Sequence, residues 1–439
     1  MEKKQILPET TPLEITFGFE LEFCVLSIPD QFLDPSPNDP RQAQGITRPK
    51  GYPDVFLPYI HQQTPLLVDG VEEYDWPEEW HYQFDALKRN IADRLTGNGY
   101  TAVADCDYDE VSSSSSIKEL RLWIVSVDRT INHGVHPDLP GYYLWPVEMK
   151  SPAYIYNEEN KQKVRSVLQF LDKSYRNRCD LSADVHVHIG NGEKGFDVRT
   201  VRNLMAFLWT FENQIASIHD PHYMTGMAFS KPVSTHSYLA SVSRVARTML
   251  KDESGSDEAL LEHDRNYAID YITSLETVDQ AVTMLSAINL KQDVLKNRLI
   301  CSICNLETDV EKVKKTIEFR QHGSTLNDVE VYHWITVCRC LVYFASMVDE
   351  ESLTEFCKKH INKTIEEFSI VEVLMAINRP VQAYYYGMKV AVARRKRKEV
   401  ERKKRAEEKR LRDQEDEHDD QDSDQDSDQD SDQGNDQGK

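Results

Sequence analysis

Residues 15–24 read ITFGFELEFC, and their alternation decides the fold that we expect. Apolar side chains occupy every second position from Phe17, while Gly18, Glu20 and Glu22 lie between them. A period of two is typical of a β-strand with one buried face. The other face would carry two neighbouring carboxylates with no counter-charge in the stretch. Because like charges on one strand face repel, a metal ion, a basic substrate or solvent must face them.

Three further stretches repeat this alternation of apolar and charged side chains. They are PVEMKSP with Glu148 and Lys150, DVHVHIG with Asp184, His186 and His188, and TIEFRQH with Glu318, Arg320 and His322. A fifth segment, RLWIVSVD, ends on Asp128. One such strand would be an ordinary solvated face, but several in one sheet would gather carboxylates, imidazoles and an arginine on one surface. That many carboxylates would raise one another's pKa unless cations compensate them.

The predicted cluster of side chains indicates a class of chemistry. Oxygen-rich sites suit Mg²⁺ or Mn²⁺, and the imidazoles favour Mn²⁺ or Zn²⁺. Carboxylates together with an arginine suit phosphoryl transfer from a magnesium nucleotide, in which metal ions bridge phosphate oxygens and the arginine stabilises transition-state charge.

Four motifs in this order, FGFELEF, VEMKSP, HVHIG and TIEFRQHGSTL, resemble the fungal-type amidoligase family. This family is related to glutamine synthetase and glutamate–cysteine ligase, the carboxylate–amine ligases. The resemblance extends from about residue 14 to about residue 386 and includes the GMKVA segment. It implies an α+β fold, with a curved antiparallel sheet of the glutamine synthetase type and helices on its outer face. It also implies ATP- and Mg²⁺-dependent joining of a carboxylate to an amine through an acyl-phosphate.

The resemblance also implies a role for each charged residue of the motifs. The metal ligands would be Glu20, Glu22, Glu148 and Glu318. His186 and His188 would lie at the metal or the nucleotide phosphates, and Arg320 at the transferring phosphoryl group. Lys150 and Asp128 are the candidates on the substrate side. The cofactors would be ATP and Mg²⁺ or Mn²⁺, and the partners small-molecule or peptide carboxylates and amines.

Two alternatives stay open. A retired ligase, kept as a binding or scaffold protein, would explain why segment 219–232 lacks an arginine that the family tends to carry. A cupin-like metal oxygenase would use His186, His188 and Glu193, spaced H-x-H-x4-E, with a later histidine such as His236. Two histidines and a carboxylate suit Fe²⁺. The cupin hypothesis leaves the two glutamates of the first strand without a role.

Charge is spread unevenly along the chain, whose net charge is −22. Residues 394–412 hold 12 Lys and Arg against 4 Glu, and residues 413–439 hold 13 acids against one Lys. By subtraction the remainder carries −18, which argues against a nucleic-acid-binding surface. We expect a disordered N-terminus over 1–12, a catalytic domain over 13–390, a charged helix over 391–412 and a disordered acidic tail over 413–439.

The location of the protein is predicted from three features. The sequence contains no run of 18 apolar residues, so neither a transmembrane helix nor a membrane partner is expected. The N-terminus, MEKKQILPETTPLE, lacks the apolar core of a signal peptide. Eight scattered cysteines are typical of reduced thiols. We therefore expect a cytoplasmic protein, with a nuclear alternative through the basic segment 394–412.

Overall fold

The computed structural model describes most of the chain, in ten segments. These are residues 13–28, 32–47, 78–107, 121–128, 130–219, 230–243, 257–289, 294–296, 299–308 and 314–426. The chain divides into one unit that ends at Gln382 and a second unit that begins at Ala383. The predicted disordered N-terminus over 1–12 and the tail after residue 426 lie outside the described residues.

The first unit is built on a ten-stranded open sheet, with the order β11-β12-β8-β1-β5-β3-β2 along its main path. These strands are β1 (Ile15–Ser27), β2 (Ala102–Ala104), β3 (Trp123–Ser126), β5 (Tyr143–Lys150), β8 (Asp184–Asn191), β11 (Cys301–Ser302) and β12 (Thr316–Gly323). Strand β4 (Gly134–Val135) pairs with β5, while β6 (Tyr154–Ile155) and β7 (Asn177–Arg178) pair with β1. Strands β9 (Ala287–Asn289) and β10 (Val294–Lys296) form a separate pair. The sheet is mostly antiparallel as predicted, except that β2 and β3 run parallel.

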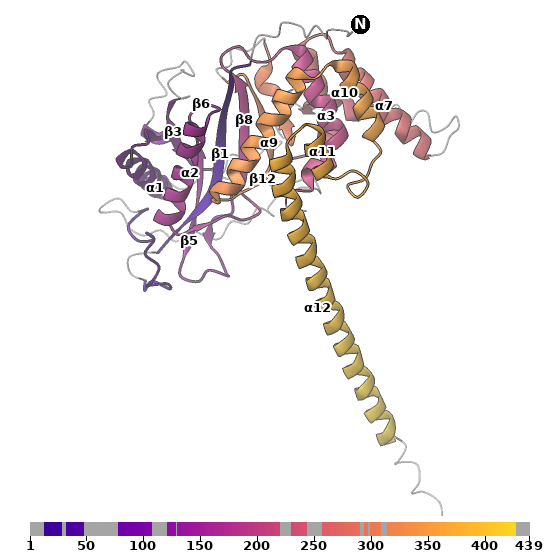
Figure 1. Cartoon of the computed structure of the whole chain (residues 1–439). Helices are drawn as coiled ribbons and strands as arrows, with labels where there is room; N and C mark the ends of the chain where they lie inside the picture. The colour runs from indigo at the N-terminus through magenta and orange to yellow at the C-terminus, as the bar shows by residue number, and fades with distance from the viewer. Residues whose placement is uncertain are drawn as a thin grey trace, which may run out of the picture. The chain divides into compact units, whose positions relative to one another are not determined.

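Helices complete a mixed α+β architecture. They are α1 (Glu78–Gly97), α2 (Glu158–Ser174), α3 (Val198–Ala216), α5 (Val233–His236), α7 (Asp257–Ser274), α8 (Val278–Leu285), α9 (Asp328–Met347), α10 (Glu350–His360), α11 (Ile370–Ala376) and α12 (Pro380–Asp426), with the 3₁₀ turns η1 (Asp105–Asp107) and η3 (Cys304–Leu306). Helix α1 packs against β2 and β3, and α9 packs against β1 and β8. Helix α3 contacts α9 and is itself contacted by α7, α8, α10 and α11, which adds a further helical layer (Figure 1).

Aromatic side chains join the helices to the apolar face of the sheet. The ring of Phe319 on β12 lies 6.3 Å from Trp334 of α9, in an edge-to-face arrangement. On the other side, Phe84 of α1 meets Trp145 of β5 at 5.2 Å, also edge to face. Such pairs stabilise the contact beyond the area that they bury. The helices therefore cover the face that carries the apolar residues of β1, and the glutamates of β1 point to the opposite face.

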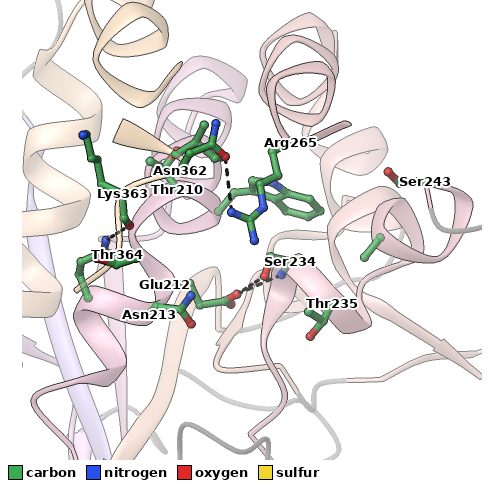
Figure 2. A pocket seen from close by; sticks show the side chains of 14 residues that line it. Thr210, Glu212, Asn213, Ser234, Thr235, Ser243, Arg265, Asn362, Lys363 and Thr364 are labelled. Carbon is green, nitrogen blue, oxygen red and sulfur yellow. Dashed lines mark hydrogen bonds between the residues drawn. The ribbon is translucent and has the colours of Figure 1, made fainter. Parts of the chain in front are cut away.

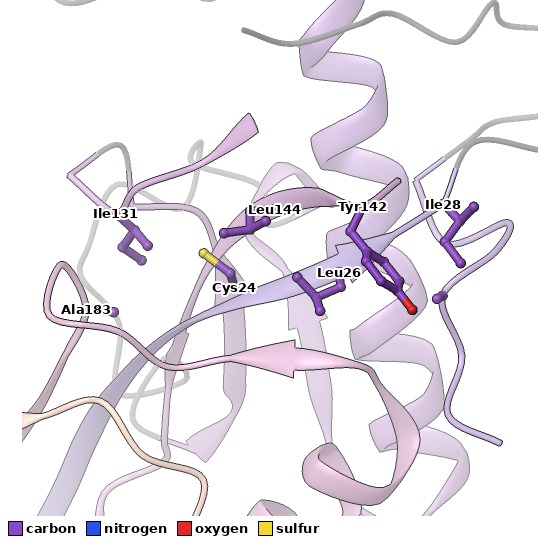
Figure 3. Packing of buried hydrophobic residues seen from close by; sticks show 8 residues of the cluster. Cys24, Leu26, Ile28, Ile131, Tyr142, Leu144 and Ala183 are labelled. Atoms are coloured by element: carbon purple, nitrogen blue, oxygen red, sulfur yellow. The ribbon is translucent and has the colours of Figure 1, made fainter. Parts of the chain in front are cut away.

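The glutamate face of β1 itself becomes apolar after Glu22. The next side chains on this face belong to a buried cluster that contains Cys24, Leu26, Ile28, Ala43, Ile131, Tyr142, Leu144 and Ala183 (Figure 3). The pairing of Leu26 with Leu144 continues the register in which Glu22 pairs with Glu148. This cluster keeps water away from one end of the charged surface, because packed apolar side chains leave little space for solvent.

A β-bulge changes the predicted alternation on β12. Phe319 pairs with Val187 and His322 pairs with Val185, so β12 has one more residue than β8 between the two pairs. His322 consequently turns to the helix side, where its ring lies 5.9 Å from that of Trp334. The sequence analysis placed His322 on the same face as Glu318, and this part of the prediction is wrong because a simple period of two does not survive a bulge.

The residues of the second unit that the structure describes, 383–426, all belong to helix α12. The predicted charged helix over 391–412 lies inside α12, and residues 394–410 are exposed. Pairs such as Glu399 and Lys403, at i and i+4, support the helix locally. Helix α12 continues to Asp426, so the first part of the tail predicted to be disordered is helical. Extending an existing helix adds one hydrogen bond for each residue without a new nucleation cost. Within the described residues, we find no helix with the length and apolar content that a bilayer requires.

Candidate metal centre

Strand register gathers the charged side chains on the open face of the sheet. On β1, Glu20 pairs with Lys150 of β5 on one side and with His186 of β8 on the other. Two residues further along the strand, Glu22 pairs with Glu148 of β5. Because side chains two residues apart share a face, these five residues project from the same surface.

Strands β8 and β12 extend this surface. His188 of β8 pairs with Glu318 of β12, and Arg320 lies in the bulge that follows Phe319. Arg320 forms an ion pair with Glu318. On the opposite flank, Ser126 of β3 pairs with Glu148 and donates a hydrogen bond of 2.9 Å to its carboxylate.

The imidazole of His186 lies at the centre of the cluster. Its Nδ1 lies 3.3 Å from Glu20 Oε2 and 3.8 Å from Glu318 Oε1. Its Nε2 lies 3.7 Å from Glu22 Oε1 and 3.9 Å from Asp184 Oδ2. One buried ring therefore lies within 4 Å of four carboxylates, a spacing that is too long for most of them to be direct hydrogen bonds.

The second imidazole has one firm partner on its outer side. His188 Nδ1 lies 3.1 Å from the hydroxyl of Thr316, while its Nε2 lies 3.3 Å from Glu20 Oε1. The Nε2 atoms of both His186 and His188 are buried, and neither makes a hydrogen bond of acceptable geometry with the protein. A buried imidazole nitrogen oriented by a bond on its other nitrogen is the usual arrangement of a metal ligand.

Among the residues that the structure describes, three groups of side chains have the spacing that metal coordination requires. They are Glu20, His188 and Glu318; Glu22, Asp184 and His186; and Glu22, Asp128 and Glu148, each with ligand atoms within 4.8 Å of one another. Glu22 belongs to two of the groups. Oxygen atoms outnumber nitrogen atoms in every group, which suits Mg²⁺ or Mn²⁺ better than a metal that prefers sulfur.

The charges of the described cluster do not balance. Its six carboxylates are those of Glu20, Glu22, Asp128, Glu148, Asp184 and Glu318. Its lysines and arginine are Lys150, 3.2 Å from Glu148, Lys314, 3.5 Å from Glu20, and Arg320 on Glu318. Three fixed positive charges face six carboxylates, so the cluster has room for the charge of one or two divalent cations.

The pKa values of Glu22 and Glu148 show the same excess of negative charge. At Glu20 burial raises the pKa, but His188, His186 and Lys314 outweigh it and hold this pKa well below its usual range. Burial raises the pKa of Glu22 well above its usual range, and the carboxylates of Asp184, Asp128 and Glu148 raise it further against the pull of His186. Burial, with the charges of Glu20 and Asp128, also raises the pKa of Glu148 although Lys150 opposes this. A bound cation would reverse these shifts, because it favours the ionised form of each carboxyl.

His186 responds to the carboxylates in the opposite sense. Burial and the charge of Arg320 both lower its pKa, but Glu22, Asp184 and Glu20 outweigh them and raise it well above the ordinary histidine value. In the metal-free protein the raised pKa favours the protonated form of His186, whose charge partly takes the place of a cation. A metal bound here would displace the proton, so metal affinity would increase with pH.

A cavity lies at the end of the centre near Gly18 and Gly190, away from the apolar cluster. It measures about 50 Å³ and is lined by Glu20, His188, Lys150, Lys314 and both glycines among others. A side chain at position 190 would come within 2.6 Å of Thr16 Oγ1, so glycine keeps this space open. The side chains of Lys150 and Lys314 remain more than a third exposed, at 37% and 40%. Two positively charged side chains, Lys150 and Lys314, therefore line the cavity beside the carboxylate cluster.

Comparison with known protein families identifies the domain. Residues 13–342 match a family model described as "Putative amidoligase enzyme". The chain belongs to this amidoligase family. The matched part of the amidoligase contains every residue of the cluster, but it ends within α9 and does not reach residue 386, where the sequence resemblance was placed. Neither the curated proteins nor the solved structures include a match to this amidoligase. Family membership supports an enzyme that forms amide bonds.

All nine side chains that sequence analysis proposed for the site lie on or beside this surface of the amidoligase. Their individual roles stay predictions. Sequence analysis did not include Asp184 and Lys314 in the site, although both continue the period of two, Asp184 before His186 and Lys314 before Thr316. The DVHVHIG motif places Asp184 on the polar face of its strand without giving it a role, and the same periodicity would have identified Lys314.

The cupin alternative does not agree with the geometry. Glu193 is exposed in the turn after β8, and His236 is exposed at the end of α5. Neither belongs to any of the candidate metal groups found among the described residues. The sheet is also open, whereas a cupin requires two sheets packed into a jelly roll.

Proposed function

We propose that this amidoligase joins a carboxylate to an amine with magnesium-ATP, through an acyl-phosphate. The observation that supports this function is the combination of overlapping carboxylate and imidazole groups with Arg320 and two lysines on one sheet surface. Phosphoryl transfer is well served by this combination, because charge on the phosphate oxygens must be stabilised on several sides.

The metal ligands would come from the central strands. One ion would be held by Glu20, His188 and Glu318, and a second by Glu22, Asp184 and His186, with Glu148 and Asp128 beside them. Bound Mg²⁺ would neutralise phosphate charge and fix the orientation of the nucleotide. This arrangement is a proposal, as is the curved sheet of the glutamine synthetase type.

Arg320 would stabilise the phosphoryl group during transfer. Its guanidinium is held by Glu318, and its backbone is held by hydrogen bonds at both the amide and the carbonyl of Arg320. The amide of Arg320 donates to Ile300 O at 2.8 Å, and Ser230 Oγ donates to Arg320 O at 2.7 Å. A side chain held in this way loses little freedom when the transition state forms.

The proposed reaction has two steps. In the first, an oxygen of the substrate carboxylate attacks the γ-phosphorus of ATP, and ADP leaves, which yields the acyl-phosphate. In the second, the amine attacks the acyl carbon, the C–O bond to phosphate breaks and inorganic phosphate leaves with the amide formed. Lys150 would hold substrate or phosphate oxygens, and Asp128 could accept the proton that the amine loses.

Trapping of the acyl-phosphate tests this function directly. We expect hydroxylamine, added with magnesium-ATP and a panel of small carboxylic acids, to yield a hydroxamate and an equal amount of ADP. Arg320→Lys should lower this rate by about 100-fold, because an ammonium cannot replace the planar guanidinium. Arg165→Lys is the matched control, since Arg165 pairs with Asp328 at 2.7 Å on helices away from the centre.

The possible results separate the proposal from its alternative. Hydroxamate formation that requires Arg320 would support the ligase. A protein that binds magnesium-ATP but forms no ADP with any of the carboxylic acids would instead be the retired ligase, used as a binding or scaffold module. Equal rates for Arg320→Lys and the wild type would contradict the role given to Arg320.

A further inference from the structure

A second cavity lies among the helices, separate from the metal centre. It measures about 390 Å³ and is enclosed by α3, α5, α7 and the turn after α10 (Figure 2). Its charged lining residues are Glu212, Arg265 and Lys363. No residue of the metal centre contributes to this lining. Its volume falls within the range of sites for small organic molecules.

Glu212, which is the acidic residue of the lining, is already engaged with the protein. Its carboxylate accepts hydrogen bonds from the amides of Val233 and Ser234, at 2.5 and 3.2 Å, and from Ser234 Oγ at 2.6 Å. These three donors belong to the start of α5. The negative charge of Glu212 is therefore satisfied by α5 and contributes little attraction for a cation in the cavity.

Positive charge and hydrogen-bond donors face the remaining space. The side chain of Arg265 extends between Asn362 and Ser234 (Figure 2), and its Nη1 lies 3.5 Å from Asn362 Oδ1. That distance is at the limit of a hydrogen bond, so the contact with Asn362 leaves donors of the exposed Arg265 guanidinium available to a ligand. Asn213 and Lys363 also line the space, and Lys363 Nζ lies 3.8 Å from Glu367 Oε1. A guanidinium fork binds carboxylate or phosphate oxygens in pairs.

The wall of this cavity is connected to the arginine of the metal centre. Ser234 lines the cavity, and four residues earlier Ser230 donates its hydroxyl to the backbone oxygen of Arg320 at 2.7 Å. Between them, Lys231 O accepts from Ile300 N at 2.9 Å, and Ile300 in turn binds the Arg320 amide. A short, hydrogen-bonded segment thus joins the cavity wall to the bulge that carries Arg320.

We propose that this cavity binds a small organic anion through Arg265, and that its occupancy changes the activity of the ligase through segment 230–234. The group recognised would be a carboxylate or a phosphate. The binding site stands on the cavity alone, whereas the effect on activity rests on the proposed ligase function.

Calorimetry on the full-length, metal-free protein tests binding, with succinate and glycerol phosphate as separate probes. We expect one of them to bind, and Arg265→Gln to weaken binding at least tenfold. Arg265→Lys should also weaken it, because it keeps the charge but loses the fork. Lys359→Gln is the control, since Lys359 is an exposed residue of α10 outside the cavity and its loss removes the same charge.

Three results would contradict the site. They are no binding of either probe, unchanged binding in Arg265→Gln, and binding that Lys150→Gln abolishes while Arg265→Gln does not, which would place the anion at the metal centre. Loss in Arg265→Gln with native circular dichroism would support the site, and the probe that binds would identify the anion.

A rate measurement tests the connection. At saturating probe, ADP formation by the wild type should change by about fivefold or more, and ADP formation by Arg265→Gln should not respond. Binding with no change in rate would overturn the connection while leaving the site. A wild type that forms no ADP at all would count against the ligase function, and the calorimetric result would be unaffected.

Discussion

The two polar sites of this amidoligase differ in the sign of the charge that they leave without compensation. The metal centre holds six carboxylates against two lysines and an arginine, and its strands fix these side chains two residues apart. Among the described residues, the lining of the helical cavity has a single carboxylate, Glu212, which three donors of α5 satisfy, and the guanidinium of Arg265 lies beside the remaining space. One site therefore calls for a cation and the other for an anion. The comparison shows that the charged residues lining a site do not by themselves indicate its ligand. It is also necessary to know which of these charges the protein already compensates.

The largest effect is expected from Glu22, which two of the candidate metal groups share. Glu22→Gln should weaken Mn²⁺ binding by about 1,000-fold, or 4 kcal/mol, since both groups lose a charged ligand. The metal-free variant should be no less stable than the wild type, because Asp184 N can still donate to the amide oxygen and repulsion is removed. Calorimetry and thermal unfolding, with and without Mn²⁺, measure both quantities.

The matched control is Glu355→Gln, at an exposed position of α10. At 100 times the dissociation constant, Mn²⁺ held with the help of Glu22 should stabilise the wild type and this control by about 2.7 kcal/mol. Glu22→Gln should lack this contribution and keep only that of an ion held by Glu20, His188 and Glu318. A metal-free Glu22→Gln protein that is strongly destabilised would show that the cluster is a structural network, which is contrary to our interpretation.

A smaller effect is expected from Glu212 in the helical cavity. Burial raises its pKa from the ordinary 4.5 to about 7, although Ser234 and the Val233 amide lower it. Between these pH values the unfolded chain loses a proton that the folded protein keeps. Its contribution to the free energy of unfolding therefore decreases as pH rises from 4.5 to 7, by on the order of 3 kcal/mol.

Urea unfolding at pH 5 and pH 8 checks this prediction. Glu212→Gln has no group to titrate, so its stability relative to the wild type should increase by that amount between the two pH values. The exposed control Glu355→Gln should show no comparable change. If the difference between Glu212→Gln and the wild type is the same at both pH values, then Glu212 is ionised throughout, and the three donors outweigh its burial.

The gathering of these charged side chains on one face of the sheet could be predicted from the sequence because a strand repeats every two residues. Each of the motifs around Glu20, Glu148, His186 and Glu318 shows which residues share a face. Antiparallel pairing then leaves few registers that keep all the apolar faces buried. Asp184 and Lys314 follow the same rule, so attention to it at both strand ends would have added them to the site.

Other features depend on contacts that no local pattern records. The bulge after Phe319 moved His322 to the helix side, and an inserted residue of this kind leaves no trace in the alternation of TIEFRQH. The cavity arises where α3, α5 and α7 meet around Glu212 and Arg265, residues that are far apart in the sequence. No motif in the sequence indicates the space beside Glu212.

The central claim is that the carboxylates of the sheet hold magnesium-ATP. Calorimetry of magnesium-ATP binding to the wild type and to the double variant Glu20→Gln/Glu22→Gln tests it most directly, with Glu355→Gln as the control. We predict that the wild type and the control bind with equal affinity and that the double variant binds at least about 100-fold more weakly. Absence of nucleotide affinity in the wild type, or equal affinity in the double variant, would contradict the claim.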